Sequence, residues 1–217
     1  MDSSRGLSPL QADLLREFFA RERRFVLTGG GALVGYHLHH RSSDDIDLFT
    51  KPPVTLEDGR LALDAAAAAL GATSQSLRSS PEFQRTLVQR GEESAVVDLV
   101  VDRAPDVDAA VDGPDGIRMH SVREIADNKV CALIGRGEIR DFVDLRMILL
   151  HGLELADVLA DAERKDGGVA AATLAWILDG LRIGSEAEVP GVTAVELETF
   201  RRELVVKLRA LAMPLDT

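Results

Sequence analysis

The stretch that decides the fold runs from Gly29-Gly30-Gly31-Ala32-Leu33 to Arg41-Ser42-Ser43-Asp44-Asp45-Ile46-Asp47-Leu48-Phe49. Asp45 and Asp47 alternate with two aliphatic residues, and residues i and i+2 of a β-strand point to the same face. At roughly 4 Å two like charges repel by about 4 kcal/mol at an effective dielectric near 20. The pair is therefore expected to hold a divalent cation. Mg²⁺ suits it, with Mn²⁺ as an alternative, because Mg²⁺ takes oxygen ligands and is commonly shared with substrate phosphates.

The residues around the glycines predict a strand, a turn and a helix. Residues 25–27 form a short apolar run typical of a strand, and residues 32–38 are expected to be helical. In this arrangement backbone N–H groups and a helix N-terminus face an anion such as a phosphate. A glycine triplet alone is a weak signal, but the carboxylate pair that follows strengthens it. Together the two motifs indicate a site for a nucleoside triphosphate and a metal ion.

A third carboxylate stands in an otherwise apolar segment. Two strands are predicted over residues 84–89 and 95–101, on either side of the turn Arg90-Gly91-Glu92-Glu93. The second of them is apolar on both faces except at Asp98. A buried carboxylate without a partner is costly. Asp98 is therefore either hydrogen-bonded for structural reasons or faces the same cation as the first pair, and the presence of that pair favours the second interpretation.

The second half of the chain predicts helices. Residues 103–116 are rich in Asp, Pro and Gly and indicate a loop or linker. Ser121 and Glu124 have the spacing of a capping box, which opens a helix that carries Lys129. Another helix is expected from about Glu138, followed by two or three more towards the end of the chain.

Composition excludes several classes of protein. The chain has 217 residues, of which 46% are hydrophobic, enough for the core of one large domain or two small ones. Its first residues are polar, and no run approaches membrane-spanning length, so a cytoplasmic protein without a membrane partner is expected. The single cysteine, Cys131, excludes an internal disulfide. The formal net charge of −11 argues against a surface that is basic throughout, although it permits a local basic pocket.

The combined pattern resembles the AbiEii/AbiGii toxin family of nucleotidyltransferases, which belong to the DNA polymerase β-like superfamily and act in toxin–antitoxin systems. The resemblance covers roughly residues 22–150 and rests on two motifs in the family's order. They comprise Gly29-Gly30-Gly31-Ala32-Leu33, His40-Arg41, Ser43 and Asp45-Ile46-Asp47-Leu48-Phe49, then Lys129, Ala132-Leu133, Arg136, Arg140-Asp141 and Asp144-Leu145. Family members usually carry Thr or Ser where Gly31 stands, so one hydroxyl expected near phosphate is missing here.

The fold expected from the resemblance and the patterns is α+β. Residues 1–117 would form a nucleotidyltransferase core, a mixed sheet with flanking helices. Residues 118–217 would form a C-terminal helical bundle that contributes Lys129 and Asp144 to the site. The resemblance further implies that Lys129 contacts the triphosphate, that Asp144 is an additional acidic active-site residue, and that Ser43 lies near the nucleotide.

The predicted site follows a two-metal displacement, in which cations clamp the attacking and leaving oxygens. The catalytic residues would be Asp45, Asp47, Asp98, Lys129 and Asp144, the first three being the metal ligands. The nucleotide-binding residues would be Gly29, Gly30, Gly31, Arg41, Ser43, Lys129, Arg136 and Arg140. Arg136 and Arg140 are expected either to bind phosphates of the nucleotide or RNA, or to pair with Asp141 and Asp144.

The leading functional hypothesis is a toxin-like enzyme that transfers a nucleoside monophosphate from an NTP, such as ATP, to an acceptor hydroxyl. By the resemblance that acceptor is the 3′ end of a tRNA, and a cognate antitoxin is an expected partner. A second hypothesis is transfer to a protein hydroxyl or to a small cationic molecule resembling an aminoglycoside, which the acidic charge would suit. The third is a non-catalytic nucleotide-binding or partner-binding module, which the intact carboxylate set disfavours.

An acidic protein that binds tRNA must gather its cations on one side. The candidates near the two motifs are Arg41, Arg118, Arg123, Lys129, Arg136 and Arg140. Contact with several phosphates would make RNA binding fall steeply with salt, because each neutralised phosphate releases counterions.

Overall fold

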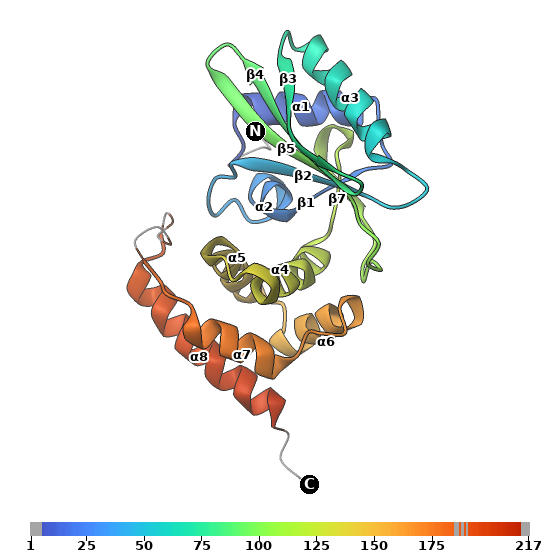
Figure 1. Ribbon diagram of the computed structural model, residues 1–217. Helices are drawn as coiled ribbons and strands as arrows, with labels where there is room; N and C mark the ends of the chain where they lie inside the picture. The colour runs from blue at the N-terminus through green and yellow to red at the C-terminus, as the bar shows by residue number, and fades with distance from the viewer. Residues whose placement is uncertain (1–5, 185–186, 188, 190, 214–217) are drawn as a thin grey trace. The chain divides into compact units, whose positions relative to one another are not determined.

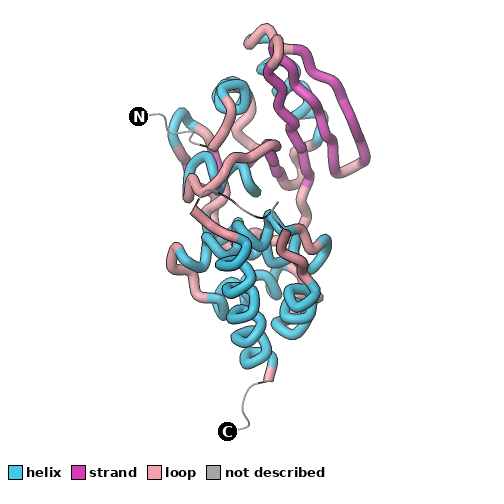
Figure 2. Tube along the Cα trace, turned by 90° about the vertical axis from the view of Figure 1, so that its left-hand side faces the viewer, coloured by secondary structure: helices cyan, strands magenta, loops and turns pink. Residues whose placement is uncertain are grey.

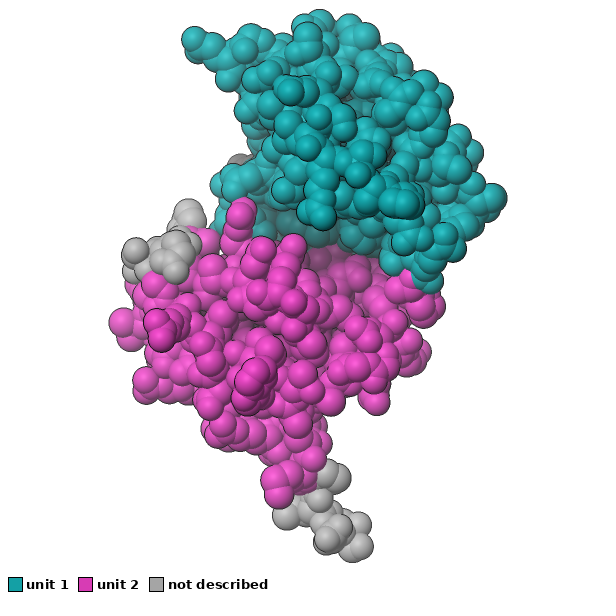
Figure 3. Space-filling view, in the orientation of Figure 1, with its two compact units in different colours: residues 1–103, 108–121 teal, residues 104–107, 122–217 magenta. Residues whose placement is uncertain are grey.

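The computed structural model describes residues 6–184, 187, 189 and 191–213. The chain divides into two compact units (Figure 3). The first comprises residues 1–103 and 108–121, and the second comprises residues 104–107 and 122–217. Every strand of the sheet belongs to the first unit, and helices α4 to α8 belong to the second.

The first unit is built on a seven-stranded mixed sheet in the order β3-β4-β5-β2-β1-β7-β6, with its strands magenta in Figure 2. The strands are β1 (Val26–Thr28), β2 (Asp45–Thr50), β3 (Thr73–Ser80), β4 (Phe83–Arg90), β5 (Glu93–Val101), β6 (Val111–Asp112) and β7 (Arg118–Met119). Strands β3, β4 and β5 are joined as antiparallel hairpins, whereas β5 pairs with β2 in parallel. The predicted strands around the carboxylate pair and around Asp98 are present.

Two helices cover one face of the central strands (Figure 1). The helices of this unit are α1 (Pro9–Phe19), α2 (Gly29–Ala32) and α3 (Leu56–Ala69), with a π-helical turn at Leu33–His37 (Figure 1). Side chains of α1 and α3 meet alternate residues of β2 and β5 around one small internal space lined by Leu14, Leu15, Phe18, Leu63, Ile46, Leu48 and Val97. All seven are at most 1% exposed. Because strand side chains alternate, the residues between them point to the opposite face.

Three local features differ from the sequence prediction. The glycines do not form a loop before a helix, because α2 begins at Gly29 itself. The alanine-rich run over residues 61–70 predicts a helix, but α3 begins earlier, at Leu56, where Thr55 and Asp58 form a capping box. Strand β3 had no sequence signal. All eight of its residues are exposed, and it is held by its antiparallel ladder with β4.

The second unit consists of helices α4 (Val122–Arg136), α5 (Ile139–Leu150), α6 (Leu155–Lys165), α7 (Ala171–Gly180) and α8 (Ala194–Ala212). Helix α4 contacts α5, α6 and α7, and α7 lies beside α8 (Figure 1). Phe142 of α5 packs on Phe200 of α8 with the ring centres 5.6 Å apart. In the described part of the chain, the helices are too short or too polar to traverse a lipid bilayer. The α+β fold predicted from sequence, a sheet followed by helices, is confirmed.

Candidate active site

Strand pairing brings the three predicted metal ligands together in the first unit. Asp47 of β2 stands directly opposite Asp98 of β5, and Asp45 precedes Asp47 by two residues on the same strand. Neighbouring strands are about 4.8 Å apart, and paired residues share a face. Asp45 and Asp47 are half-buried, and Asp98 is 4% exposed. The three carboxylates thus share the face that α1 and α3 leave open.

A cation that sequence analysis missed joins this group. Arg85 of β4 binds Asp98 through two hydrogen bonds, Nε to Oδ1 at 2.8 Å and Nη2 to Oδ2 at 2.6 Å. The hydrogen bonds to Asp98 raise the pKa of Arg85, and the charges of Asp45 and Asp47 add to the increase. Of the two interpretations left open by the sequence, structural hydrogen bonding of Asp98 is therefore present, and its role as a metal ligand stays a prediction. Asp98 also faces the carboxylate pair.

The glycine motif lies against the same group. Gly29 has a φ of 62°, and a Cβ there would come within 2.2 Å of Asp47 Oδ2. Only glycine combines that backbone conformation with so close an approach. A Cβ on Gly30 would lie 2.8 Å from Arg41 Nη2 and 3.0 Å from Ser43 Oγ. These nucleotide-binding candidates of the first unit therefore surround one short turn.

Ser43 and Gly31, two further nucleotide-binding candidates, have different surroundings. The Ser43 hydroxyl donates to the Asp45 carbonyl oxygen at 3.0 Å, which braces the start of β2. A Cβ on Gly31 would meet the Asp45 carbonyl oxygen at 3.4 Å and Leu27 at 3.5 Å, both ordinary contacts. The position therefore has room for the β-carbon of the Ser or Thr that the family usually carries.

In the second unit, Lys129 lies in a buried ion-pair cluster. Its Nζ is 2.8 Å from Asp141 Oδ1 and 2.7 Å from Asp144 Oδ2, and its side chain is 8% exposed. Burial lowers the pKa of Lys129, but the charges of Asp144 and Asp141 outweigh that effect and leave the pKa raised. Lys129 is thus a charged ammonium group held between two enclosed carboxylates.

Arg136 completes this cluster. Its Nε and Nη2 lie 2.9 Å and 3.1 Å from the two oxygens of Asp141, while 55% of its side chain is exposed. Of the two alternatives for Arg136, pairing with a carboxylate is therefore present. Arg140 lies exposed at the start of α5. The proposed role of Lys129 at a triphosphate and that of Asp144 in catalysis stay predictions.

A second buried cluster was not foreseen. Lys165 at the end of α6 contacts Glu124, Asp127 Oδ1 at 3.0 Å and Asn128 Oδ1 at 2.8 Å. Glu124, predicted as a capping residue, also accepts the Val107 N–H at 2.8 Å. Within the described residues, Asp127 Oδ2 is buried without a hydrogen-bond partner, and burial raises the pKa of Asp127 to about 7. The only available sequence signal was the helical spacing of polar residues 124, 127 and 128.

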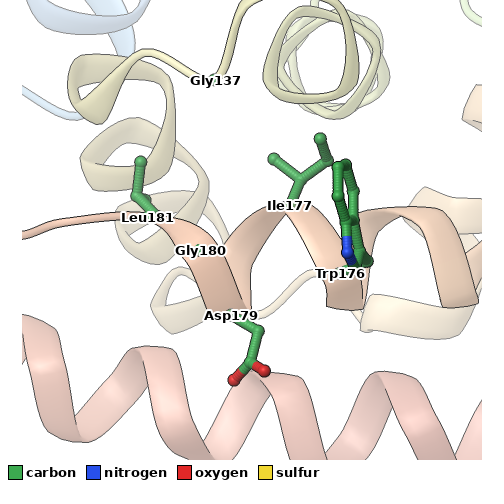
Figure 4. A pocket seen from close by; sticks show the side chains of 6 residues that line it. All are labelled: Gly137, Trp176, Ile177, Asp179, Gly180 and Leu181. Atoms are coloured by element: carbon green, nitrogen blue, oxygen red, sulfur yellow. The ribbon is translucent and has the colours of Figure 1, made fainter.

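The second unit also has a shallow hollow of about 470 Å³, lined by Gly137, Trp176, Ile177, Asp179, Gly180 and Leu181 (Figure 4). Trp176 is 75% exposed. Asp179 points to the other side of α7, where its Oδ2 accepts a hydrogen bond from Arg209 at 3.0 Å. The hollow therefore presents apolar side chains and glycine backbone, and we assign it no catalytic role.

Comparison with known protein families identifies one family. The sequence model described as the nucleotidyl transferase AbiEii toxin, type IV TA system, matches residues 13–212. A Helicobacter pylori protein described as a nucleotidyltransferase has a TM-score of 0.58 and 19% identity, over 94% of this chain and 95% of that one. JHP933 from Helicobacter pylori has a TM-score of 0.54 and 21% identity, over 92% and 90%. These two likenesses establish the fold. No curated protein sequence matches.

Proposed function

Because the chain belongs to the AbiEii family of nucleotidyltransferase toxins of type IV toxin–antitoxin systems, we propose that it transfers a nucleoside monophosphate from an NTP to the 3′ hydroxyl of an RNA, with tRNA as the leading acceptor. The observation that carries the proposal is the pairing of Asp47 with Asp98, with Asp45 beside them on β2. A cognate antitoxin is the partner expected of such a toxin.

The carboxylates fit a Mg²⁺ site. Asp45, Asp47 and Asp98 offer only oxygen donors, which this ion prefers. The Gly29 backbone lies against Asp47, where a side chain would crowd that carboxylate. We assign Asp45 and Asp47 as the ligands of the metal ions, and Asp98 as the ligand on the acceptor side. When bound, the metal would neutralise phosphate charge and make the acceptor hydroxyl a better nucleophile.

The protein's own residues mainly position the reacting groups and neutralise phosphate charge. Arg85 holds Asp98 through both carboxylate oxygens, so that this carboxylate keeps one orientation beside Asp47. Arg41 lies against Gly30 and offers a planar guanidinium, which suits phosphate oxygens. This positioning matters because phosphoryl-type transfer depends largely on alignment and charge stabilisation.

We further propose that the helical unit supplies Lys129 to the β- and γ-phosphates. The raised pKa keeps the ammonium charged, and charge builds on the leaving oxygens as the bond breaks. In this proposal Asp141 and Asp144 hold the ammonium group by ion pairs before NTP binds. Asp144 is the additional acidic residue of the site.

The experiment that tests the function is incubation with each α-labelled NTP, Mg²⁺ and total RNA, beside a reaction without RNA. We expect label on RNA, absent with the Asp47→Asn protein and weakening sharply between about 50 and 200 mM salt. Label on the protein itself or on an added aminoglycoside, with RNA inert at every salt concentration, would favour the second hypothesis. Absence of both transfer and NTP binding would support a non-catalytic module.

A further inference from the structure

Asp47 and Asp98 form one end of a longer row of charged residues that crosses the sheet. Cross-strand partners connect Asp47 of β2 to Asp98 of β5, Asp98 to Arg85 of β4, and Arg85 to Arg78 of β3. Directly paired residues share a face. One face of the sheet therefore runs from acidic at β2 to basic at β3, over three strand spacings, or about 14 Å at ~4.8 Å each.

A β-bulge sets the side on which Arg78 lies. Ser76 pairs with Thr86 and Arg78 pairs with Arg85, so Leu77 is an extra residue between the two pairs. Thr86 is buried on the helix-covered side, whereas Arg85 belongs to the carboxylate face. Ser76 and Arg78 thus point to opposite faces although they are two residues apart, and simple alternation along β3 would misplace Arg78.

An aromatic ring stands beside the two arginines. The guanidinium carbons of Arg78 and Arg85 lie 5.7 Å and 5.9 Å from the centre of the Phe83 ring. Phe83 shares the face of Arg85, two residues away on β4, and is half-buried. Arg78 is exposed, and in the described part of the chain no carboxylate pairs with it. A cation that has no ion-pair partner can bind a phosphate, and the aromatic ring beside it can stack with a base.

The arrangement has a physical purpose if the acceptor is a polynucleotide. A terminal hydroxyl that approaches three carboxylates brings its own phosphates towards like charges, which repel them. Cations farther along the same face offset that repulsion, and an aromatic ring gives an unpaired base a surface for stacking. Unstacked single-stranded ends, rather than duplex, expose the base faces that such a ring can hold.

We propose that Arg78, Phe83 and Arg85 form a platform for the single-stranded segment just before the 3′ end of an RNA acceptor. One base stacks on Phe83, Arg78 contacts a phosphate, and Arg85 links the platform to Asp98. The proposal rests on the proposed function, and it names the part of the sheet that binds the acceptor. Its occupant is argued from charge complementarity and from continuity with the carboxylates.

The test measures binding of a short 5′-fluorescein-labelled single-stranded RNA and of a tRNA pool, in EDTA, by anisotropy over a salt series. Phe83→Leu removes the ring and keeps an apolar side chain, and we expect about tenfold weaker binding. Arg78→Ala should lower the slope of log K against log salt by about 1. Phe83→Trp should bind at least as well as the parent, because it keeps a stacking surface.

Arg60→Ala is the matched control. It removes the same charge from α3, which packs on the opposite face, where Arg60 pairs with Glu57 and Asp64. Thermal unfolding of every variant checks that the fold is kept. In transfer assays, Arg78→Ala and Phe83→Leu should raise KM for RNA, whereas KM for NTP should stay at the parent value.

The outcomes separate this proposal from the proposed function. If the parent labels RNA while Phe83→Leu and Arg78→Ala bind RNA like the parent, the platform is wrong and the function stands. If the parent neither binds nor labels RNA, the function fails and the platform falls with it. If Arg60→Ala lost as much RNA binding as Arg78→Ala, the effect would come from overall charge, and the platform would be overturned. Loss of labelling of a protein acceptor, with RNA binding unchanged, would overturn it in favour of a protein partner.

Discussion

Carboxylates are held in opposite ways in the two units. On the sheet, Asp45 and Asp47 are half-buried on a strand and stand beside a third carboxylate. In the helices, Asp141 and Asp144 are at most 1% exposed and are bonded to the ammonium of Lys129. The first group assembles like charges at a partly open face, whereas the second encloses opposite charges together.

The difference follows from what burial costs. Removing an ion from water costs several kcal/mol, which only a well-placed opposite charge offsets. The enclosed helical carboxylates therefore depend on the charge of Lys129, and we expect its replacement to lower stability. Asp45 and Asp47 keep contact with solvent, and under the proposed function they accept a cation together with substrate. We accordingly expect changes at the sheet to affect chemistry first, and changes in the helices to affect stability as well.

The largest expected effect is at the centre of the sheet group. Asp47→Asn and Asp45→Asn should each reduce nucleotidyl transfer by about 10³-fold or more, because each removes the charge of a proposed metal ligand. Thermal unfolding should be unchanged or slightly higher, since like-charge repulsion is relieved. Asp64→Asn, on α3 at the opposite face, is the control and should keep activity. Near-parental turnover of either variant would refute the site assignment.

Asp98→Asn sharpens the comparison, because Asp98 is both buried and part of the sheet group. Transfer should fall by about 10²- to 10³-fold, while NTP binding is more nearly preserved if this carboxylate serves the acceptor side. A modest loss of stability is also expected, since Arg85 loses a charged hydrogen-bond partner. Equilibrium NTP titration and single-turnover transfer separate the two effects. Loss of NTP binding equal to the loss of transfer would contradict an acceptor-side role.

Lys129→Met tests whether the helical cluster does more than stabilise. It should lower stability by about 3–5 kcal/mol, because buried carboxylates lose their partner, and kcat/KM for NTP by about 10²-fold. Urea unfolding and steady-state kinetics measure the two quantities. The double variant Lys129→Met/Asp141→Asn should regain part of the stability but not the transfer. Recovery of transfer together with stability would reduce Lys129 to a structural role.

The smallest expected effect on transfer concerns Asp127 of α4, whose Oδ2 is buried without a hydrogen-bond partner in the described part of the chain. Burial raises the pKa of Asp127 from 3.8 to about 7, between Glu124 of its own helix and Lys165 of α6. Between these values the unfolded chain loses a proton that the folded protein keeps, so stability falls as pH rises from about 4 to about 7 and levels off above. The full shift corresponds to at most about 4 kcal/mol.

Comparison with Asp127→Asn isolates this contribution from other titrating groups. Chemical unfolding of both proteins across pH 4–8, a range set by the two pKa values, should give curves that diverge as pH falls, with the parent gaining stability relative to the variant. Parallel curves would mean that Asp127 keeps an ordinary pKa in the folded protein.

Sequence predicts this fold best where one side of an element is covered. In β2, Ile46 and Leu48 are buried and the residues between them are not, which is the alternation that predicted the strand. Strand β3 shows no alternation because helices bury neither of its faces, and its backbone ladder with β4 leaves no mark on residue type. The early start of α3 depended on a cap at Thr55, which a search for apolar spacing overlooks.

The candidate site likewise contains features that local sequence predicted and features that it did not. The shared face of Asp45 and Asp47 followed from spacing along one strand, and the odd polarity of β5 singled out Asp98. The hydrogen bonds from Arg85 to Asp98 depend on the register of the β4–β5 hairpin. The contact of Lys165 with Asp127 depends on packing between α4 and α6. Such pairings require knowledge of which elements are neighbours, which no local pattern supplies. The catalytic roles themselves stay predictions until the variants are assayed.

The bulge at Leu77 also bears on whether the exposed edge of the sheet can pair with a strand of another molecule. Strand β3 lies at one end of the strand order, so its outer peptide groups could accept a strand from another molecule. An extra residue interrupts that edge, and Arg78 places a charge beside the interruption. Deleting Leu77 together with Arg78→Val would leave a regular, less polar edge with the fold retained. Such a protein should form concentration-dependent oligomers or fibrils, so Arg78, proposed to contact RNA, would also help to keep the sheet edge from pairing with other molecules.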